Sequence, residues 1–365
     1  MKQLIRLLIN LLPVDMANCI YRTSLKRVYA DKDSWKLSYY VSKKKYAKCK
    51  YVVLRFGGES RIGIFGVLRT VLFSVDYWEK RHYKPVIDLE DGDYLESGNL
   101  GEHNKWENCF RQVSVREVMR KDYVLVEDLG RTRALMSTCR KINGNFSPFV
   151  GIERDEWRDY YKKVNRYLQK WLRKSNKVQA VLEKDFYSKI KNSEKVLGVL
   201  MREEFSEEAY EMMPEERKKV MDIHPRVPNT DKIVEMVEDY IEKYKIDKIF
   251  LSTAHIETLN KFLERFGERI FYIDRKRTTL NLYRINQFGL SDAGARESIT
   301  NEWGDTEIEV PVKYVSEIYA LSECQYLIGV PCGGLVGAMM LNGGKYDDIM
   351  LLEDLNLKTE NYSVD

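Results

Sequence analysis

The chain has 365 residues, more than one hydrophobic core usually serves, so its length alone predicts two domains. Its hydrophobic content of 44% and aromatic content of 12% are those of a globular protein and exclude extensive disorder. The six cysteines form no CxxC pair, and the four histidines form no HExxH motif. These patterns argue against a zinc site, a disulfide scaffold and a metal catalyst, and they favour the reducing cytosol.

The net charge of +4 conceals an uneven distribution along the chain. Residues 1–200 contain 40 lysines and arginines against 24 aspartates and glutamates, whereas residues 201–365 contain 20 against 32. A basic front half suits an anionic membrane surface, a phosphate-bearing acceptor or nucleic acid. Nucleic acid is the weakest of these alternatives because no nucleic-acid-binding motif accompanies the charge. We therefore expect no nucleic-acid partner.

The first predicted element is an amphipathic helix at the N-terminus. Its apolar stretch is interrupted by Arg6 and closed by Pro13, falls short of the ~20 residues that cross a bilayer, and is followed by no small-residue cleavage site. Such a helix either docks on its own domain or lies on a membrane surface. We expect a cytoplasmic protein, with peripheral binding to the inner membrane face as the alternative to internal docking. The leucines at helical spacing are Leu4, Leu7, Leu8, Leu11 and Leu12.

The first α/β block begins at residue 50. A strand over 50–58 ends in a glycine pair, a helix follows over 62–82, and strands are predicted over 84–90 and 122–128. This order is a βαβ unit. The intervening turn, GGESRIGIFG, lacks both the GxGxxG and the GK[ST] pattern. A plain tight turn explains its glycines as well as an anion site does, and an arginine within it favours the anion site. The candidate binding residues there are Gly57, Gly58, Arg61 and Gly63.

A long helix is predicted after the first block, within 155–190. Its apolar face consists of Trp157, Tyr161, Val164, Leu168 and Trp171, which recur at steps of four and three. We place the domain boundary at the end of this segment, with one domain over 1–190 and the other over 191–365.

The second block alternates strands and helices more regularly than the first. Two Rossmann-like domains facing across a cleft are typical of the GT-B architecture of nucleotide-sugar glycosyltransferases, although a two-domain dehydrogenase or ligase alternates similarly. The alternation itself predicts a doubly wound parallel sheet. Strands are predicted over 195–201, 248–253, 269–274 and 325–330, and helices over 230–244, 256–267, 315–324 and 335–343.

Three strand ends of this block are candidates for one binding site, because ligands of open α/β sheets lie beyond the carboxyl ends of the strands. Arg202 follows the first strand, and Thr253 and His255 follow the second. Glu317 lies on a helix expected to flank the crevice, where it could contact the ribose or the base. The last strand leads into a loop of small residues, Cys332, Gly333 and Gly334.

The second block resembles the superfamily of α-1,6-fucosyltransferases, nodulation fucosyltransferases and protein O-fucosyltransferases, most closely its bacterial members from polysaccharide gene clusters. Over residues 195–355 the resemblance rests on LGVLMREEF, HP at 224–225, DKIFLST, RIFYIDRKR, VSEIYALSECQYLIGV and GGLVGAMMLNGGKY. Over the first block it rests on the βαβ unit, PVIDLE and NKWENCFRQV.

The resemblance implies a metal-independent, inverting glycosyltransferase without a cofactor. It implies a nucleotide-sugar donor, typically GDP-fucose, bound by the second domain. The first domain would bind a glycan or lipid-linked oligosaccharide acceptor in bacterial surface polysaccharide synthesis.

The match to the family's donor motifs is partial. The family's HxRR-type motif places an arginine on the donor diphosphate, and Arg202 matches it, but the motif histidine is Leu200 and the second arginine is Glu203. The family's acidic pair after the second strand is Ala254–His255 here, and its Ser/Gln-type loop is Pro331–Gly334. Glycosyl transfer is therefore better supported than the identity of the base or the sugar.

Transfer needs a positive group for the leaving diphosphate and a general base for the acceptor hydroxyl. Arg202 is the candidate for the first role. Glutamates at 203, 204, 207 and 208 are candidates for the second, of which we choose Glu204, and His224 is the other candidate. A glutamate cluster that opens a helix also simply complements the helix dipole.

Two rival interpretations remain. A nicotinamide-dependent or other nucleotide-dependent enzyme predicts a GxGxxG or P-loop motif, and neither is present. A non-catalytic carbohydrate- or nucleotide-binding protein that retains the fold is compatible with the altered motif residues.

Overall fold

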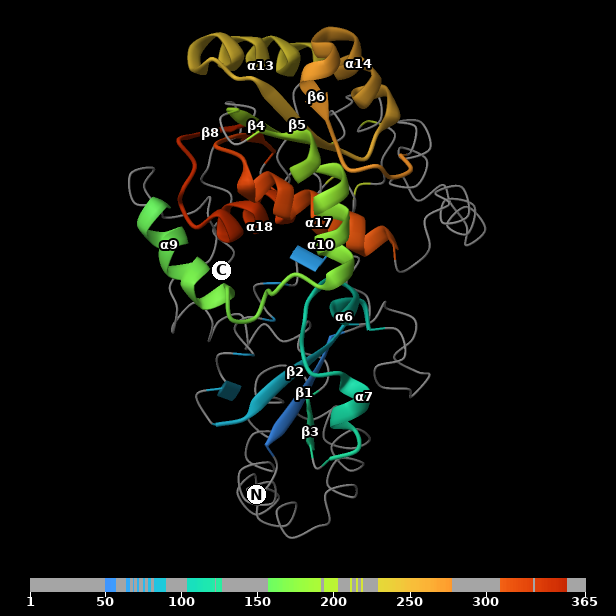
Figure 1. Cartoon of the computed structure of the whole chain (residues 1–365). Coiled ribbons are helices and arrows are strands. Elements are labelled where there is room, and N and C mark those ends of the chain that lie inside the picture. Colours follow the sequence, from blue (N-terminus) through green and yellow to red (C-terminus); the bar gives the residue numbers. More distant parts are fainter. Residues whose placement is uncertain are drawn as a thin grey trace. The chain divides into compact units, whose positions relative to one another are not determined.

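The computed structural model describes residues 50–56, 82–89, 104–121, 123–126, 157–191, 194–202, 229–277, 309–330 and 332–352, with isolated positions between 64 and 79 and between 211 and 218. The chain divides into two compact units, Met1–Phe146 and Ser147–Asp365. Each unit is built on a parallel β-sheet (Figure 1). The α/β class predicted from the sequence is therefore confirmed.

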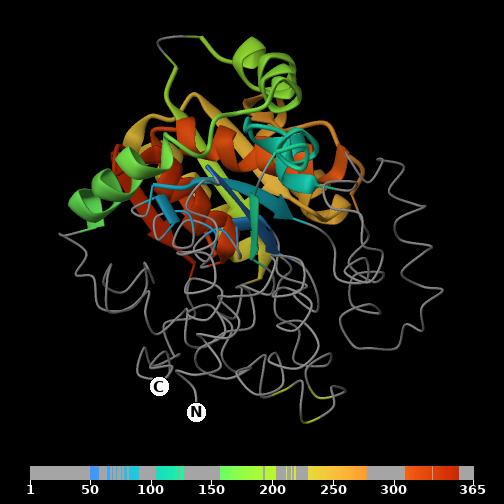
Figure 2. The same cartoon turned by 90° about the horizontal axis from the view of Figure 1, so that it is seen from below.

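The first unit contains a three-stranded parallel sheet with the order β2-β1-β3. The predicted helix over 62–82 is helical at every described position from 64 to 79, and its described apolar side chains are buried. Helices α6 and α7 lie beside β2 (Figures 1 and 2). The predicted βαβ unit is thus present. The described elements are β1 (Tyr51–Phe56), β2 (Lys84–Leu89), α6 (Lys105–Cys109), α7 (Val115–Val118) and β3 (Tyr123–Val126).

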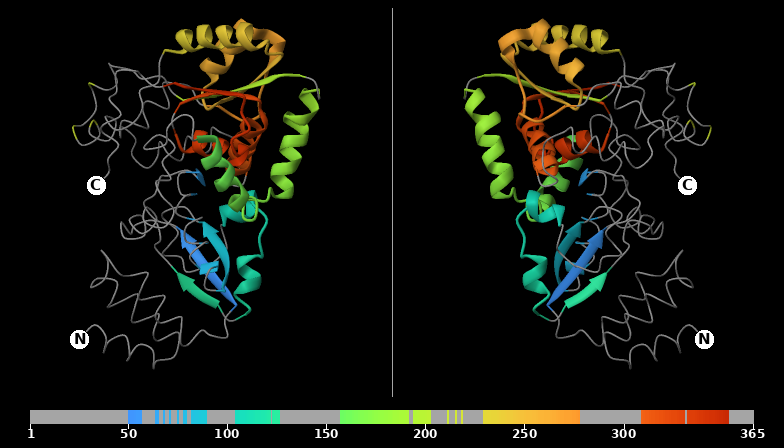
Figure 3. Two further views of the ribbon diagram at one scale, coloured as in Figure 1. Left: turned by 90° about the vertical axis from the view of Figure 1, so that its left-hand side faces the viewer. Right: turned by 90° about the vertical axis from the view of Figure 1, so that its right-hand side faces the viewer.

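The second unit contains a five-stranded parallel sheet with the order β6-β5-β4-β7-β8. Helices α13 and α14 cover one face of this sheet, and α17 and α18 cover the other (Figures 1 and 3). This is the doubly wound parallel sheet that the sequence predicts. The strands are β4 (Val196–Met201), β5 (Lys248–Thr253), β6 (Ile270–Phe271), β7 (Tyr326–Gly329) and β8 (Asp348–Leu351). The helices are α9 (Trp157–Leu168), α10 (Asn176–Asp185), η3 (Tyr187–Lys189), α13 (Thr230–Tyr244), α14 (Ile256–Phe266), η4 (Gly267–Arg269), α17 (Glu309–Glu323) and α18 (Gly333–Asn342).

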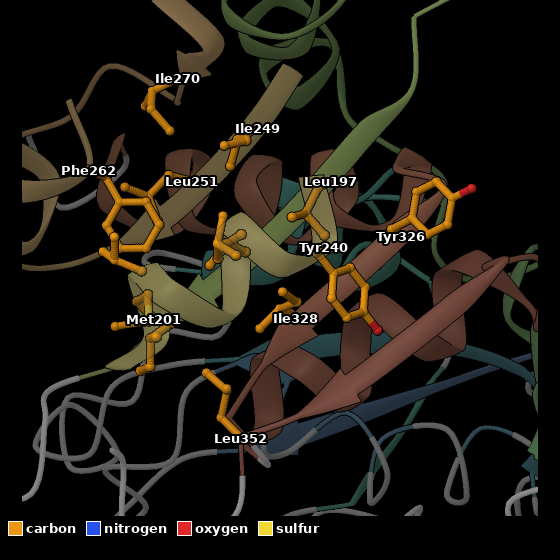
Figure 4. Close-up of a cluster of buried hydrophobic side chains, with 14 of the residues drawn as sticks. Leu197, Met201, Tyr240, Ile249, Leu251, Phe262, Ile270, Tyr326, Ile328 and Leu352 are labelled. Atoms are coloured by element: carbon orange, nitrogen blue, oxygen red, sulfur yellow. The ribbon is translucent and has the colours of Figure 1, made fainter. Parts of the chain in front are cut away.

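The main hydrophobic core of the second unit lies between the sheet and helices α13 and α14 (Figure 4). Alternate residues of each strand point to it, because successive side chains of a strand face opposite sides. On β4 these are Leu197, Val199 and Met201, all of them at most 2% exposed. Their partners include Ile249 and Leu251 of β5, Tyr326 and Ile328 of β7, and Phe262 of α14.

The opposite face of the sheet is closely approached by α17 and α18. A Cβ atom added to Gly198 would lie 3.0 Å from Leu321 Cδ2 of α17, and one added to Gly329 would lie 2.6 Å from Leu335 Cδ1 of α18. A larger residue at either position would require these leucine side chains to shift, so the glycines let the helices approach the strands closely. This close packing sets the N-terminal end of α18 directly beyond the carboxyl end of β7.

Helices α9 and α10 belong to the second compact unit, whereas the sequence-based boundary at 190/191 assigns them to the first domain. Asn165 Nδ2 of α9 donates to the carbonyl oxygens of Met340 and Leu341, at 3.0 and 2.6 Å, at the end of α18. Arg158 donates to two further carbonyls just beyond, those of Tyr346 and Asp347. Helix α10 in turn packs on α17. The partners of both helices thus lie within the compact unit Ser147–Asp365.

The predicted long helix within 155–190 is two helices. Helix α9 ends at Leu168, so Trp171 lies in the following turn and not on the helical face. Helix α10 then starts after Ser175, whose side chain accepts a hydrogen bond from Val178 N at 3.2 Å. This N-cap supplies a new helix start that the apolar spacing alone does not reveal.

Candidate functional site

The candidate site lies at the carboxyl ends of the strands in the second unit, where doubly wound sheets bind ligands. Arg202 follows Met201, the last residue of β4, and Met201 pairs in register with Thr253, the last residue of β5. On the other side of β4, strand β7 ends at Gly329 and leads into the first turn of α18. The structure thus brings the three predicted strand ends to one edge of one sheet.

A buried ion pair crosses this edge. Arg275, four residues beyond β6, places its Nε 2.8 Å from Oε1 of Glu317 on α17. The other carboxylate oxygen, Oε2, accepts a hydrogen bond from Ser252 Oγ at 3.0 Å. Glu317 is 0% exposed, and Arg275 is 12% exposed. Both oxygens of the carboxylate are therefore engaged by groups of the protein.

Arg275 is also fixed by the backbone of the neighbouring strand. Its second terminal nitrogen, Nη2, donates to the carbonyl oxygen of Thr253 at 3.1 Å. The guanidinium therefore extends from the end of β6 across the end of β5, towards the strand that carries Arg202.

A second arginine, Arg277, binds the backbone of the loop that carries Arg275. Its Nη1 and Nη2 donate to the carbonyl oxygens of Arg275 and Ile273, and its guanidinium lies 4.6 Å from the centroid of the Tyr272 ring. Burial lowers the pKa of Arg277. These contacts hold the backbone of residues 273–277 and so define the direction from which Arg275 enters the site.

Tyr314 lies one helical turn before Glu317 on α17 and points to the start of α18. A Cβ atom added to Gly334 would lie 2.9 Å from the Tyr314 hydroxyl. Burial raises the pKa of Tyr314 well above its ordinary value, and Cys332 adds to this, whereas the positive charge of Arg202 acts in the opposite direction. The phenol is therefore a neutral hydrogen-bond donor that lies near both Arg202 and Cys332.

The first turn of α18 also lies at the carboxyl edge of the second sheet. Cys332 is the N-cap residue, its side chain makes no capping hydrogen bond, and its carbonyl accepts the first helical bond from Val336 N at 3.0 Å. The first amides of a helix have no partner within it, and the helix dipole favours an anion there. Together with Arg202 and Arg275, this end of the helix offers donors to a negatively charged ligand.

Two of the predicted binding residues are enclosed in the turn between β5 and α14. Thr253 is 1% exposed and His255 is 0% exposed. Thr253 Oγ1 accepts a hydrogen bond from His255 N at 3.3 Å, which shapes the turn. Thr253 contributes to the site through its carbonyl oxygen, and a direct ligand contact by either side chain stays a prediction.

Glu317 differs from the sequence-based expectation in a similar way. It was expected to contact the ribose or the base, but its carboxylate is buried and used by Arg275 and Ser252. Its contacts are those of a residue that positions Arg275, and a direct contact with the ribose or the base stays a prediction. The candidate residues Gly57, Gly58, Arg61, Gly63, Glu204 and His224 lie outside the described residues.

Sequence reasoning missed Arg275, Ser252 and Tyr314. The basic run Arg275–Lys276–Arg277 is a signal for Arg275, because it directly follows the end of the strand predicted over 269–274. Tyr314 lies three residues before Glu317 and so on the same helical face, which a helical projection shows. Ser252 carried no signal, since a serine inside a strand is ordinary.

No protein-family model matches the sequence, and no curated protein matches it. Solved structures with partial similarity to the chain are found. A structure of NodZ α-1,6-fucosyltransferase soaked with GDP-fucose covers 80% of this chain and 93% of its own, at 13% identity and a TM-score of 0.40. NodZ from Bradyrhizobium covers 76% of this chain and 88% of its own, at 13% identity and a TM-score of 0.37.

A structure of POFUT1 in complex with GDP covers 87% of this chain and 78% of its own, at 10% identity and a TM-score of 0.33. NodZ is a fucosyltransferase by its description.

Among the described residues, no group of three or more His, Cys, Asp or Glu side chains is arranged to hold a metal ion. None of the helices that the structure describes combines the length and apolar character needed to cross a bilayer.

Proposed function

We propose that the chain is a glycosyltransferase of GT-B type whose second unit binds a nucleotide sugar. The observation that carries the proposal is the carboxyl edge of the second sheet, where the end of β4 that leads to Arg202, the guanidinium of Arg275 and the first turn of α18 all lie. A departing nucleoside diphosphate develops negative charge, which fixed guanidinium groups and a helix N-terminus stabilise. The proposal assigns this role to these groups and not to a metal ion.

The donor and the acceptor are proposed from the sequence. The resemblance of residues 195–355 supports a GDP-sugar, with fucose as the transferred sugar and inversion at its anomeric carbon. The basic front half supports an acceptor that carries phosphate, such as a lipid-linked oligosaccharide of bacterial surface polysaccharide synthesis, at the cytoplasmic face of the membrane. Glu204 or His224 is the proposed general base.

The direct test compares binding of GDP and guanosine by calorimetry in the wild type and in Arg202→Ala. Loss of a charge-assisted contact costs on the order of 1.5–3 kcal/mol, or about ten- to a hundredfold in affinity. We expect this loss for GDP and an unchanged affinity for guanosine. Arg269→Ala is the matched control, because Arg269 is an exposed arginine of the same unit, in η4. Equal losses for both ligands would give Arg202 a structural role instead.

The activity test uses GDP-fucose, GDP-mannose and the UDP-sugars, each with free and lipid-linked oligosaccharides, and detects the glycosylated product by mass spectrometry. Transfer that needs both Arg202 and Glu204 supports the proposal. Loss of transfer in Glu204→Gln with donor binding intact would identify the base.

A non-catalytic binding protein is the second candidate, and one observation favours it. Leu200 occupies the position of the motif histidine, is 6% exposed, and packs 3.6 Å from the position of a Cβ on Gly334. A polar group is thus replaced by an apolar one beside α18. This candidate predicts donor binding without any product.

A further inference from the structure

We infer that Arg275 is a second diphosphate-binding residue, that it acts beside Arg202, and that Glu317 and Ser252 position it. The inference rests on the proposed function in one respect, since it takes the ligand to be a nucleoside diphosphate. It assigns a role to a residue that lies 73 positions beyond Arg202 in the sequence and on a different part of the sheet edge.

The direction of the Arg275 side chain supports this inference. Arg275 follows β6, at the end of the sheet, yet its Nη2 donates to the carbonyl oxygen of Thr253 on β5 at 3.1 Å. Thr253 pairs in register with Met201, the residue next to Arg202. The guanidinium of Arg275 therefore reaches inward along the carboxyl edge towards Arg202, and not outward to solvent.

The guanidinium of Arg275 is held in place by the protein before any ligand binds. Glu317 Oε1 binds Arg275 Nε at 2.8 Å, and its Oε2 is held by Ser252 Oγ at 3.0 Å. Glu317 and Ser252 are 0% and 1% exposed, so neither has room to turn. An arginine held in this way loses little freedom on binding an anion, which is the property of a preorganised site.

Arg275 has N–H donors beyond those that bind the protein. A guanidinium carries more N–H donors than the two that bind Glu317 and Thr253. Arg275 is 12% exposed, whereas its carboxylate partner is fully buried. Arg275 and Arg202 both lie close enough to Tyr314 for their positive charges to act against the rise in the pKa of its hydroxyl. The two guanidinium groups therefore share one neighbour at this edge of the sheet.

The chemistry of the ligand follows from the pair. Guanidinium groups bind phosphate oxygens through planar, directional donors. One guanidinium follows β4 and the other follows β6 and reaches across the end of β5, while α18 begins after β7 on the other side of β4. Two such groups match a ligand with two linked phosphoryl groups better than one with a single group. We therefore expect Arg275 to discriminate diphosphates from monophosphates.

The experiment measures the affinity for inorganic pyrophosphate, GDP, GMP and guanosine by calorimetry, in the full-length chain. Arg275→Lys keeps the positive charge beside Glu317 but loses the planar donors. We expect about a tenfold loss of affinity for pyrophosphate and GDP, a smaller loss for GMP and none for guanosine. Arg269→Lys is the matched control and is expected to bind all four ligands as the wild type does. Wild-type affinity for GDP in Arg275→Lys would weigh against the inference.

A second variant keeps the test valid if charge imbalance disturbs the fold. Arg275→Gln with Glu317→Gln removes both members of the ion pair, so no buried charge is left alone. We expect this double variant to melt close to the wild type and still to lose pyrophosphate affinity. Glu317→Gln alone should weaken pyrophosphate binding, but should add nothing in the Arg275→Gln background, because Glu317 acts through Arg275. A folded double variant with wild-type affinity overturns the inference.

The outcomes separate this inference from the proposed function. Pyrophosphate and GDP binding that depends on Arg275, with no sugar transfer to any acceptor, supports the inference and contradicts the glycosyltransferase. Sugar transfer that depends on Arg202 but not on Arg275 supports the glycosyltransferase and contradicts the inference. A wild-type chain that binds neither pyrophosphate nor any nucleoside diphosphate overturns the inference outright.

Discussion

Arg275 and Glu317 join the end of β6 to helix α17 through an ion pair whose Nε–Oε1 distance is 2.8 Å, with the carboxylate fully buried. A buried pair of this kind contributes little net stability as a pair, because both charges lose their hydration. Its members depend on each other, however. The stability of the second unit should therefore respond very differently to removal of one partner and to removal of both.

Arg275→Ala should lower the free energy of unfolding by about 3 kcal/mol, because it leaves the Glu317 carboxylate buried without a counter-ion. The double substitution Arg275→Gln with Glu317→Gln should cost much less, since two neutral amides can bond to each other and to Ser252. Urea denaturation of the three proteins measures both values. Equal costs for the single and double variants would show that the carboxylate does not need the arginine.

Gly334→Ala should destabilise the start of α18, because the new methyl group would lie 2.9 Å from the Tyr314 hydroxyl and 3.1 Å from Ile318 Cδ1. Overpacking of this kind costs about 1–3 kcal/mol. Tyr314→Phe removes the nearer atom, so it should recover part of the loss in the Gly334→Ala background. A double-mutant cycle by thermal denaturation gives the coupling energy. Additive costs would mean that the two residues do not meet.

Asp348, at the start of β8, should make the stability of the second unit depend on pH in the acid range. Burial alone would raise the pKa of this carboxyl, but hydrogen bonds from the Tyr244 and Tyr240 hydroxyls, at 2.5 and 2.8 Å, lower it below its ordinary 3.8. The folded pKa lies below the unfolded one, so the stabilisation is complete above the unfolded value and is lost as the pH falls through the folded value.

Tyr244→Phe removes one of these donors and should cost about 1 kcal/mol at neutral pH. The cost should shrink as the pH falls below about 3.8. Free energies of unfolding at a series of pH values test this, with Asp348→Asn as the control that abolishes the same pH dependence. A cost for Tyr244→Phe that is constant with pH would contradict the role assigned to the carboxylate.

Asn165→Ala should destabilise the end of α18, because the amide of Asn165 supplies hydrogen bonds to the carbonyls of Met340 and Leu341. An unsatisfied buried carbonyl costs about 1–3 kcal/mol. Hydrogen exchange of the amides near the end of α18 should accelerate in this variant, whereas exchange in the first unit should not change. Uniform acceleration over the whole chain would instead indicate a global loss of stability.

The elements of the second unit could be predicted from the sequence because their signals are local. Val196–Met201 is an apolar run of strand length, and Thr230–Tyr244 has its apolar residues at helical spacing after the N-cap Asn229. The convergence of the strand ends followed from the rule for parallel sheets. These features need only neighbours in the chain and one rule of topology.

The contacts of Glu317 could not be predicted in that way. Its partners, Arg275 and Ser252, lie 42 and 65 residues away, and no local pattern marks a pair at such a separation. The docking of α9 on α18 could not be predicted for the same reason, since Asn165 finds its partners 175 and 176 residues further on. Interactions between distant segments decide what a side chain does once local structure has formed.

The docking of α9 on the end of α18 has a practical consequence for any attempt to produce the second unit by itself. A fragment cut at the predicted boundary, beginning at residue 191, would lack the amide donors of Asn165 and the helix that packs on α17. Bare apolar helix faces and unsatisfied carbonyls of this sort favour aggregation during expression. A fragment that begins at Ser147 keeps both helices, and it is the version suited to crystallisation with a nucleotide.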